Sequence, residues 1–259
     1  MLLKYFEKSV QRKISFRKET IILYFYWPFF IFLLFQWTLA FPVGISKKAT
    51  ATGFMDFNYY YDSRDFNSLT IKNMANITDQ TQYYSFVNYS NSSGSDKNLD
   101  KTKFYTEQNI RWAVIKNFMP VDLTTQWVIR SWNHNDILRF GPRLRVSTTK
   151  WLKKFFKYMN MRYTINFYVV NLGGNDNYNW QMEHVYKIML FPKTFNNRIY
   201  ISGFFDHNFI STGDKIVTEH QIGFRIIDQL FIVSEYRLNE FFTSKKSGVG
   251  TGLEYKIIF

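Results

Sequence analysis

The segment from Ser247 to Phe259 constrains the fold more than any other part of this sequence. In an extended strand, successive side chains point to opposite faces. One face of this segment carries Val249, Thr251, Leu253, Tyr255, Ile257 and Phe259, and the other carries Gly248, Gly250, Gly252, Glu254 and Lys256. The first face suits hydrocarbon, and the second suits water or close packing. The pattern predicts either the edge strand of a soluble sheet or a strand of a β-barrel whose outer wall contacts lipid.

The composition favours the barrel. Aromatic residues make up 20% of the 259 residues, with 28 Phe and 18 Tyr, while the mean hydropathy is only −0.26. A helical membrane protein would be far more apolar, whereas half of each strand in a membrane barrel is polar. The only apolar stretch long enough to span a membrane as a helix runs from Ile21 to Ala40.

The N-terminus has the pattern of an export signal. A basic region precedes an apolar core at Ile21–Phe35, and Thr38, Leu39 and Ala40 form a candidate cleavage site. We therefore expect residues 1–40 to be a signal peptide and residues 41–259 to form the barrel; an uncleaved anchor is the alternative. Residues 1–40 carry six basic and two acidic side chains, so their removal lowers the formal net charge from +13 to +9. Because exported chains seldom meet nucleic acid, we expect no nucleic-acid partner.

Amphipathic runs separated by polar or turn-forming breaks follow residue 48. They predict strands at 51–62, 67–77, 80–90, 103–115, 121–132, 137–148, 161–171, 179–190, 198–209, 216–226, 230–240 and 248–259. About twelve strands is an even number, as expected for a single-chain bacterial barrel. The predicted fold class is all-β: a closed antiparallel transmembrane β-barrel of about 12 strands. A soluble β-sandwich would show the same alternation.

One connection has a helical pattern. Between Lys150 and Met159, apolar residues form one stripe and lysines flank it. A short amphipathic helix near 150–159 is therefore predicted, and its basic and aromatic character suits a membrane interface. A surface helix on a soluble core is the alternative.

The polar face of the strands carries charges of both signs. We predict that this face lines a pore, with these residues exposed to it: Arg111, Arg130, Arg139, Arg143, Arg145, Arg162, Glu107, Glu183, Lys187, Glu219, Arg225, Glu235, Arg237 and Glu254. Two interpretations of these charges compete. They brace a closed barrel by pairing across strands, or Arg130, Arg139, Arg143 and Arg145 form a track that attracts anions through a channel.

The sequence offers little for catalysis. There is no cysteine, which excludes disulfides and thiolate chemistry. The pairs Glu183-His184 and Glu219-His220 place their two side chains on opposite faces of a strand, so they cannot share a ligand. No serine has a recognisable nucleophile context, and no metal-ligand or phosphate-binding motif is present. We expect no catalytic residue, metal or cofactor; a lipid-modifying enzyme is the least favoured alternative.

The chain resembles outer-membrane β-barrel proteins of Gram-negative bacteria, through its strand pattern and its terminal Phe259. It also resembles the Tsx-like nucleoside-specific channel family, through its strand number, its aromatic first strand from Gly53 to Asp62 and its glycine-rich end. The resemblance implies an outer-membrane location in contact with lipid and lipopolysaccharide, and recognition of the last strand by the barrel-assembly machinery. It implies a channel for small polar or anionic solutes, nucleosides among them. A closed structural or adhesive barrel is the alternative.

Overall fold

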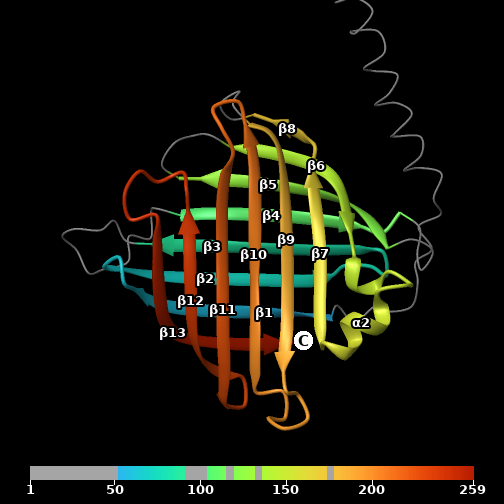
Figure 1. The fold of residues 1–259 in the computed structure, drawn as a ribbon, viewed down its shortest axis with the longest axis vertical. Helices are drawn as coiled ribbons and strands as arrows, with labels where there is room; N and C mark the ends of the chain where they lie inside the picture. Colours follow the sequence, from blue (N-terminus) through green and yellow to red (C-terminus); the bar gives the residue numbers. More distant parts are fainter. Residues whose placement is uncertain (1–51, 91–103, 115–119, 132–135, 174–177) are drawn as a thin grey trace, which may run out of the picture. The chain divides into compact units, whose positions relative to one another are not determined.

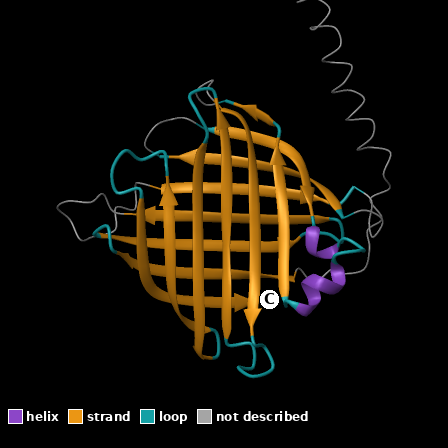
Figure 2. Ribbon diagram, viewed as in Figure 1, coloured by secondary structure: helices purple, strands orange, loops and turns teal. Residues whose placement is uncertain are grey.

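The computed structural model describes residues 52–90, 104–114, 120–131, 136–173 and 178–259, and nearly all of them lie in strands (Figure 1, Figure 2). The strands are β1 (Thr52–Asp62), β2 (Phe66–Asn76), β3 (Thr81–Ser90), β4 (Phe104–Trp112), β5 (Val121–Arg130), β6 (Ile137–Leu144), β7 (Met161–Tyr168), β8 (Val170–Leu172), β9 (Tyr178–Leu190), β10 (Ile199–Ile210), β11 (Lys215–Ile227), β12 (Leu230–Asn239) and β13 (Ser247–Ile258). A 3-10 turn, η1 (Val146–Thr148), and one short helix, α2 (Lys153–Tyr158), lie between β6 and β7.

The strands form one antiparallel sheet that closes on itself. β7 and β8 both pair with β6 and are two parts of one strand interrupted at Val169, so the barrel has twelve strands. Figure 1 shows β7 and β9–β13 crossing in front of β1–β5, which form the opposite wall. The predicted twelve-stranded antiparallel barrel and the helix near 150–159 are confirmed. The prediction for residues 1–40 lies outside the described residues.

The first and last strands join at a seam. β1 pairs with β13 from Phe54–Ile258 to Asp62–Gly250. Beyond this ladder, Phe259 and Gly53 exchange two backbone hydrogen bonds, of 2.7 and 3.1 Å. Closure satisfies the edge groups that an open sheet would leave exposed. That the assembly machinery recognises Phe259 stays a prediction.

Exposure alternates along the strands with the predicted period, but it is inverted relative to a soluble protein. On β1, Asp56, Asn58 and Asp62 are buried inside the barrel, while Tyr59 and Tyr61 are 46% and 56% exposed on its outer wall. Most buried side chains of the described residues are polar or charged, and the outer wall is rich in Ile, Leu, Val and Tyr. A soluble β-sandwich buries its apolar face, so this distribution excludes that alternative.

The strand ends differ from the predicted bounds in one instructive place. β6 ends at Leu144 rather than near residue 148, because the chain turns into η1 at Val146 and continues into α2. The buried ring of Phe156 holds α2 against the outer wall by stacking on Tyr163, with ring centroids 5.9 Å apart. No helix among the described residues is long and apolar enough to cross a membrane.

Candidate functional site

A cavity of about 520 Å³ lies inside the barrel. Its lining includes charged residues of both signs and aromatic rings, drawn from strands all around the barrel. Asn160 and Arg162, before and within the start of β7, and Phe54 near the start of β1 belong to it. The cavity therefore reaches the end of the barrel where β1 begins and β13 ends. We call this end the cavity end.

The carboxylates in one half of the cavity are held by neighbouring groups. Lys256 forms ion pairs with Glu254 and, at 3.4 Å, with Asp56. The hydroxyl of Tyr200 also donates to Glu254, and the side-chain amide of Gln221 lies 3.3 Å from the same carboxylate oxygen. Glu254 is only 1% exposed, so these partners replace the water that burial removes.

The remaining cavity carboxylates are paired as well. Arg237 forms an ion pair with Glu235 and lies 3.7 Å from Glu219. Glu183 accepts hydrogen bonds from the Asn166 amide and, at 3.5 Å, from the Tyr168 hydroxyl. Each negative charge of the cavity therefore has a donor from the protein itself.

Three cations in the cavity lining, unlike these carboxylates, have no oppositely charged side chain in direct contact among the described residues. Within the described part of the chain, Lys72, Arg162 and Lys187 form no ion pair, and the Nζ of Lys187 lies 4.3 Å from the Tyr200 ring centroid. Arg162 and Lys187 are register partners on β7 and β9, so they project from adjacent positions of the same wall. These three cations are therefore not held by a contact ion pair with any described carboxylate of the cavity.

Side chains from distant strands meet beside the cavity and narrow the lumen. The hydroxyl of Tyr60 on β1 lies 3.0 Å from Oδ1 of Asn58 and 3.0 Å from Oε1 of Gln221 on β11. On the other side, the Tyr168 hydroxyl of β7 donates to Asn109 of β4 at 3.1 Å. All five side chains are nearly or fully buried. These contacts join non-adjacent strands across the interior.

The structure places half of the predicted pore-lining set on this cavity. These residues are Arg111, Arg162, Glu183, Lys187, Glu219, Glu235 and Glu254. The others are Arg130, Arg139, Arg143, Arg145, Glu107, Arg225 and Arg237, which lie outside the cavity lining. That the full set lines an open pore stays a prediction.

Three of the four arginines in the proposed track contact acceptor side chains on β5. Arg143 and Arg145 both contact Asp122, at 2.9 and 3.1 Å. Arg139 donates to Gln126 at 2.7 Å, and Gln126 in turn donates to Glu107 at 2.7 Å. These contacts are those expected of charges that brace neighbouring strands.

Two other members of the set have different surroundings. The guanidinium of Arg130 lies 5.4 Å from the Tyr105 ring centroid. Arg225 donates to the backbone carbonyl of Asn196 at 2.7 Å, so its guanidinium lies at the turn between β9 and β10.

Sequence reasoning missed the aromatic part of the cavity. Phe54, Tyr84, Phe86 and Tyr200 all contribute to its lining. Phe54 and Tyr200 lie an even number of positions from the buried Asp56 and Asp206 on the same strands, so the alternation itself places them on the interior face. We expected a polar interior and assigned aromatic residues to the outer wall and its interfaces, which is the reason for the omission.

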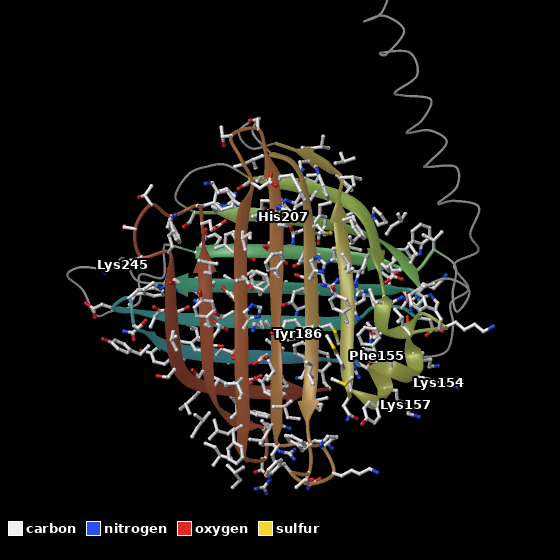
Figure 3. The ribbon with its side chains drawn as sticks, in the orientation of Figure 1. Lys154, Phe155, Lys157, Tyr186, His207 and Lys245 are labelled. Atoms are coloured by element: carbon white, nitrogen blue, oxygen red, sulfur yellow. The ribbon has the colours of Figure 1, made fainter. Side chains whose placement is uncertain are left out.

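The histidines on the outer wall form satisfied hydrogen-bond chains. Tyr186, labelled on β9 in Figure 3, places its hydroxyl 2.9 Å from Nδ1 of His220, whose Nε2 lies 2.7 Å from the Thr218 hydroxyl oxygen. Thr218 donates its proton to the backbone carbonyl of Phe204 at 2.6 Å. His220 is therefore a donor to Thr218 rather than a base that activates it. Within the described residues, no group of three or more His, Cys, Asp and Glu side chains could hold a metal ion.

Comparisons with known proteins give structural likeness alone. No protein-family model matches the sequence, and no curated protein matches it. Among solved structures, the chain is similar to the KdgM porin, with a TM-score of 0.48 and 10% identity over 78% of this chain and 98% of that one. A complex of the KdgM porin with disordered oligogalacturonate gives a TM-score of 0.47 and 11% identity, over 78% and 98% of the two chains. A triple mutant of the Rhodopseudomonas blastica porin gives 0.37 and 7%, over 80% and 99%.

Proposed function

We propose that this chain is an outer-membrane barrel that admits small polar solutes, preferentially anionic ones, through a narrow lumen. The inverted distribution of side chains supports the membrane location. Leu253 and Tyr255 are exposed on the outer wall while Glu254 between them is buried inside. A lysine or arginine on the lipid side would cost about 2–4 kcal/mol at the membrane midplane, and the strands keep such charges inside.

The proposed anion preference is supported by a difference between the two signs of charge in the cavity: the carboxylates have partners, and three cations form no ion pair with a described residue. Its carboxylates are engaged by Lys256, Arg237 and neutral donors, whereas Lys72, Arg162 and Lys187 have no ion-pair partner among the described residues. A solute that enters therefore meets cations that it can pair with, while the carboxylates are already occupied. Rings of fixed cations select for anions in other pores.

The aromatic lining supports a solute with a flat or apolar face. Tyr84, Tyr200 and Phe54 offer such surfaces next to the free cations. Stacking on aromatic side chains is a general way to hold nucleobases, so nucleosides and their phosphates are solutes that the cavity suits.

A closed structural barrel is the second candidate. The buried contacts of Tyr60 with Asn58 and Gln221, and of Tyr168 with Asn109, favour it because they fill the interior beside the cavity. A barrel closed by these contacts would be impermeable to solutes even though its cavity binds them.

Reversal-potential measurements in planar bilayers test the proposal. Under a salt gradient the native protein should prefer anions, because free cations face the lumen. The double variant Lys72→Gln and Lys187→Gln should lose most of this preference. A second double variant, Arg139→Gln and Arg143→Gln, removes the same charge from engaged guanidinium groups and should change it less.

A matched control and a second assay complete this test. The loop variant Lys245→Gln with Lys246→Gln removes two charges remote from the cavity and should behave as the native protein does. If the native protein shows neither conductance in bilayers nor flux of nucleosides or small anions into liposomes, the channel proposal fails and the closed barrel takes its place.

A further inference from the structure

Two neighbouring connections form a basic and aromatic rim at the cavity end of the barrel. They are residues 150–159, which contain α2, and residues 191–198, the turn between β9 and β10. We propose that this basic rim binds the phosphate-bearing headgroups of anionic phospholipids in the surrounding leaflet. The proposal rests on the membrane location of the proposed function but not on solute passage, because the rim lies outside the lumen.

The two parts of the rim are joined. The backbone N–H of Met189 donates to the carbonyl of Asn160 at 3.1 Å, which fixes the end of the helical connection beside the strand that leads into the turn. Arg225 adds a guanidinium to the turn through its bond to Asn196. The rim is therefore a continuous surface built from two connections.

The charge of the rim is of one sign and is unneutralised. Residues 145–162 and 191–198 contain no Asp or Glu. The exposed cations of the rim are Lys150, Lys153, Lys154, Lys157, Lys193 and Arg198. None of them forms an ion pair with any residue that the structure describes. Each lysine or arginine near an anionic membrane surface adds to the attraction for that surface.

Exposed aromatic side chains accompany these cations. Trp151 and Tyr158 are 78% and 83% exposed, and Phe155, Phe191 and Phe195 are exposed as well. Aromatic rings of this kind occupy the headgroup level of a bilayer. A rim that combines them with lysines has the composition of an interfacial helix rather than that of a surface solvated by water alone.

The placement of the helix directs the charges toward the leaflet. Phe156 packs on Tyr163, which belongs to the outer wall of β7. In Figure 3, Phe155 lies on the side of α2 next to β7, while Lys154 and Lys157 lie on the side turned away from the strands. The rim therefore projects sideways from the barrel, where headgroups would surround it.

The opposite end of the barrel lacks this character. Its described connections, residues 63–65, 211–214 and 240–246, contain acidic as well as basic side chains. Asp214 pairs with His207 at 3.0 Å, and Lys245 donates to the carbonyl of Arg64 at 3.0 Å. Among the described connections, the run of basic residues without acidic neighbours therefore belongs to the rim, and a matched control can be made at the opposite end.

Native mass spectrometry of the full chain, released from nanodiscs with equal amounts of phosphatidylglycerol and phosphatidylcholine, tests the proposal. The native protein should retain phosphatidylglycerol in excess. The variant Lys154→Gln with Lys157→Gln should lower that excess about tenfold, since two of the cations that attract anionic lipid are gone. The variant Lys245→Gln with Lys246→Gln, which removes the same charge at the opposite end, should leave it unchanged.

Several results would overturn the proposal. They are equal retention of the two lipids by the native protein, an equal loss in both variants, or preferential retention of lipid A when it is added to the nanodiscs. Conductance measured in bilayers of phosphatidylcholine alone reports on the lumen and not on the rim. A native protein that conducts ions but shows no preference for phosphatidylglycerol therefore contradicts this inference alone. A native protein that prefers phosphatidylglycerol but does not conduct contradicts the proposed channel alone.

Discussion

At the scale of single residues, the interior depends on charges that are buried together with their partners. Glu254 is the clearest case, because it is almost fully buried and interacts with Lys256, Tyr200 and Gln221 at once. Removing one member of such a group leaves the others without a partner and without water. The group therefore matters more through the cost of breaking it than through the net free energy of forming it.

Replacement of Glu254 with Ala should lower the free energy of unfolding by about 3–5 kcal/mol, as expected when a buried ion pair loses one partner. The measurement is urea unfolding in lipid vesicles, followed by tryptophan fluorescence. The variant Glu254→Gln should lose less stability than Glu254→Ala, because its amide oxygen can still accept hydrogen bonds from Tyr200 and Gln221. A single variant as stable as the native protein would show that Glu254 is not a bracing group.

At the scale of elements, the glycines of β13 let the last strand approach the first. A Cβ placed on Gly252 would lie 1.8 Å from the backbone oxygen of Tyr59, on β1. A Cβ on Gly250 would lie 3.3 Å from the Tyr60 Cβ, a tight contact that a small shift can relieve. The seam therefore requires glycine at residue 252 more strictly than at residue 250.

This difference predicts a graded response to alanine. Gly252→Ala should destabilise the barrel by about 1–3 kcal/mol, the range for overpacking a tight contact, because a backbone atom must move. Gly250→Ala should cost less. Both can be measured by the same urea unfolding, with Thr251→Ala on the outer wall as the control. An equal effect of the two glycine variants would contradict the close approach seen at the seam.

At the scale of the whole barrel, closure joins all twelve strands into one hydrogen-bonded ring. A closed barrel has no free edge at which strands can separate one at a time, and its backbone groups are satisfied without water. We therefore expect unfolding to be cooperative and the folded barrel to resist detergent.

This expectation leads to a test on denaturing gels. Protein folded in detergent should migrate differently when it is loaded without boiling, because the intact barrel binds less detergent than the unfolded chain. Circular dichroism of the unboiled sample should show a β-rich spectrum. Recovery of the described barrel as a soluble monomer without detergent would contradict the membrane assignment.

The sequence by itself determined the strands, their approximate number and the side of the wall that each residue occupies. These properties follow from local alternation, since consecutive residues of a strand must face opposite ways. Glu254 and Leu253 could thus be assigned to opposite faces before any pairing was known. The short helix near Phe155 was predictable for a similar reason, because its apolar stripe recurs within a single turn.

Only the tertiary structure decided which charges inside the barrel form ion pairs with one another. Tyr60 and Gln221 are 161 residues apart in the chain and meet across the interior, because closure fixes the tilt and stagger of the strands. The same geometry brings Arg143 and Arg145 to Asp122 and leaves Lys72 and Lys187 facing the cavity without ion-pair partners among the described residues. Alternation assigns a charge to a face, but its partner depends on contacts across the barrel that no local pattern encodes.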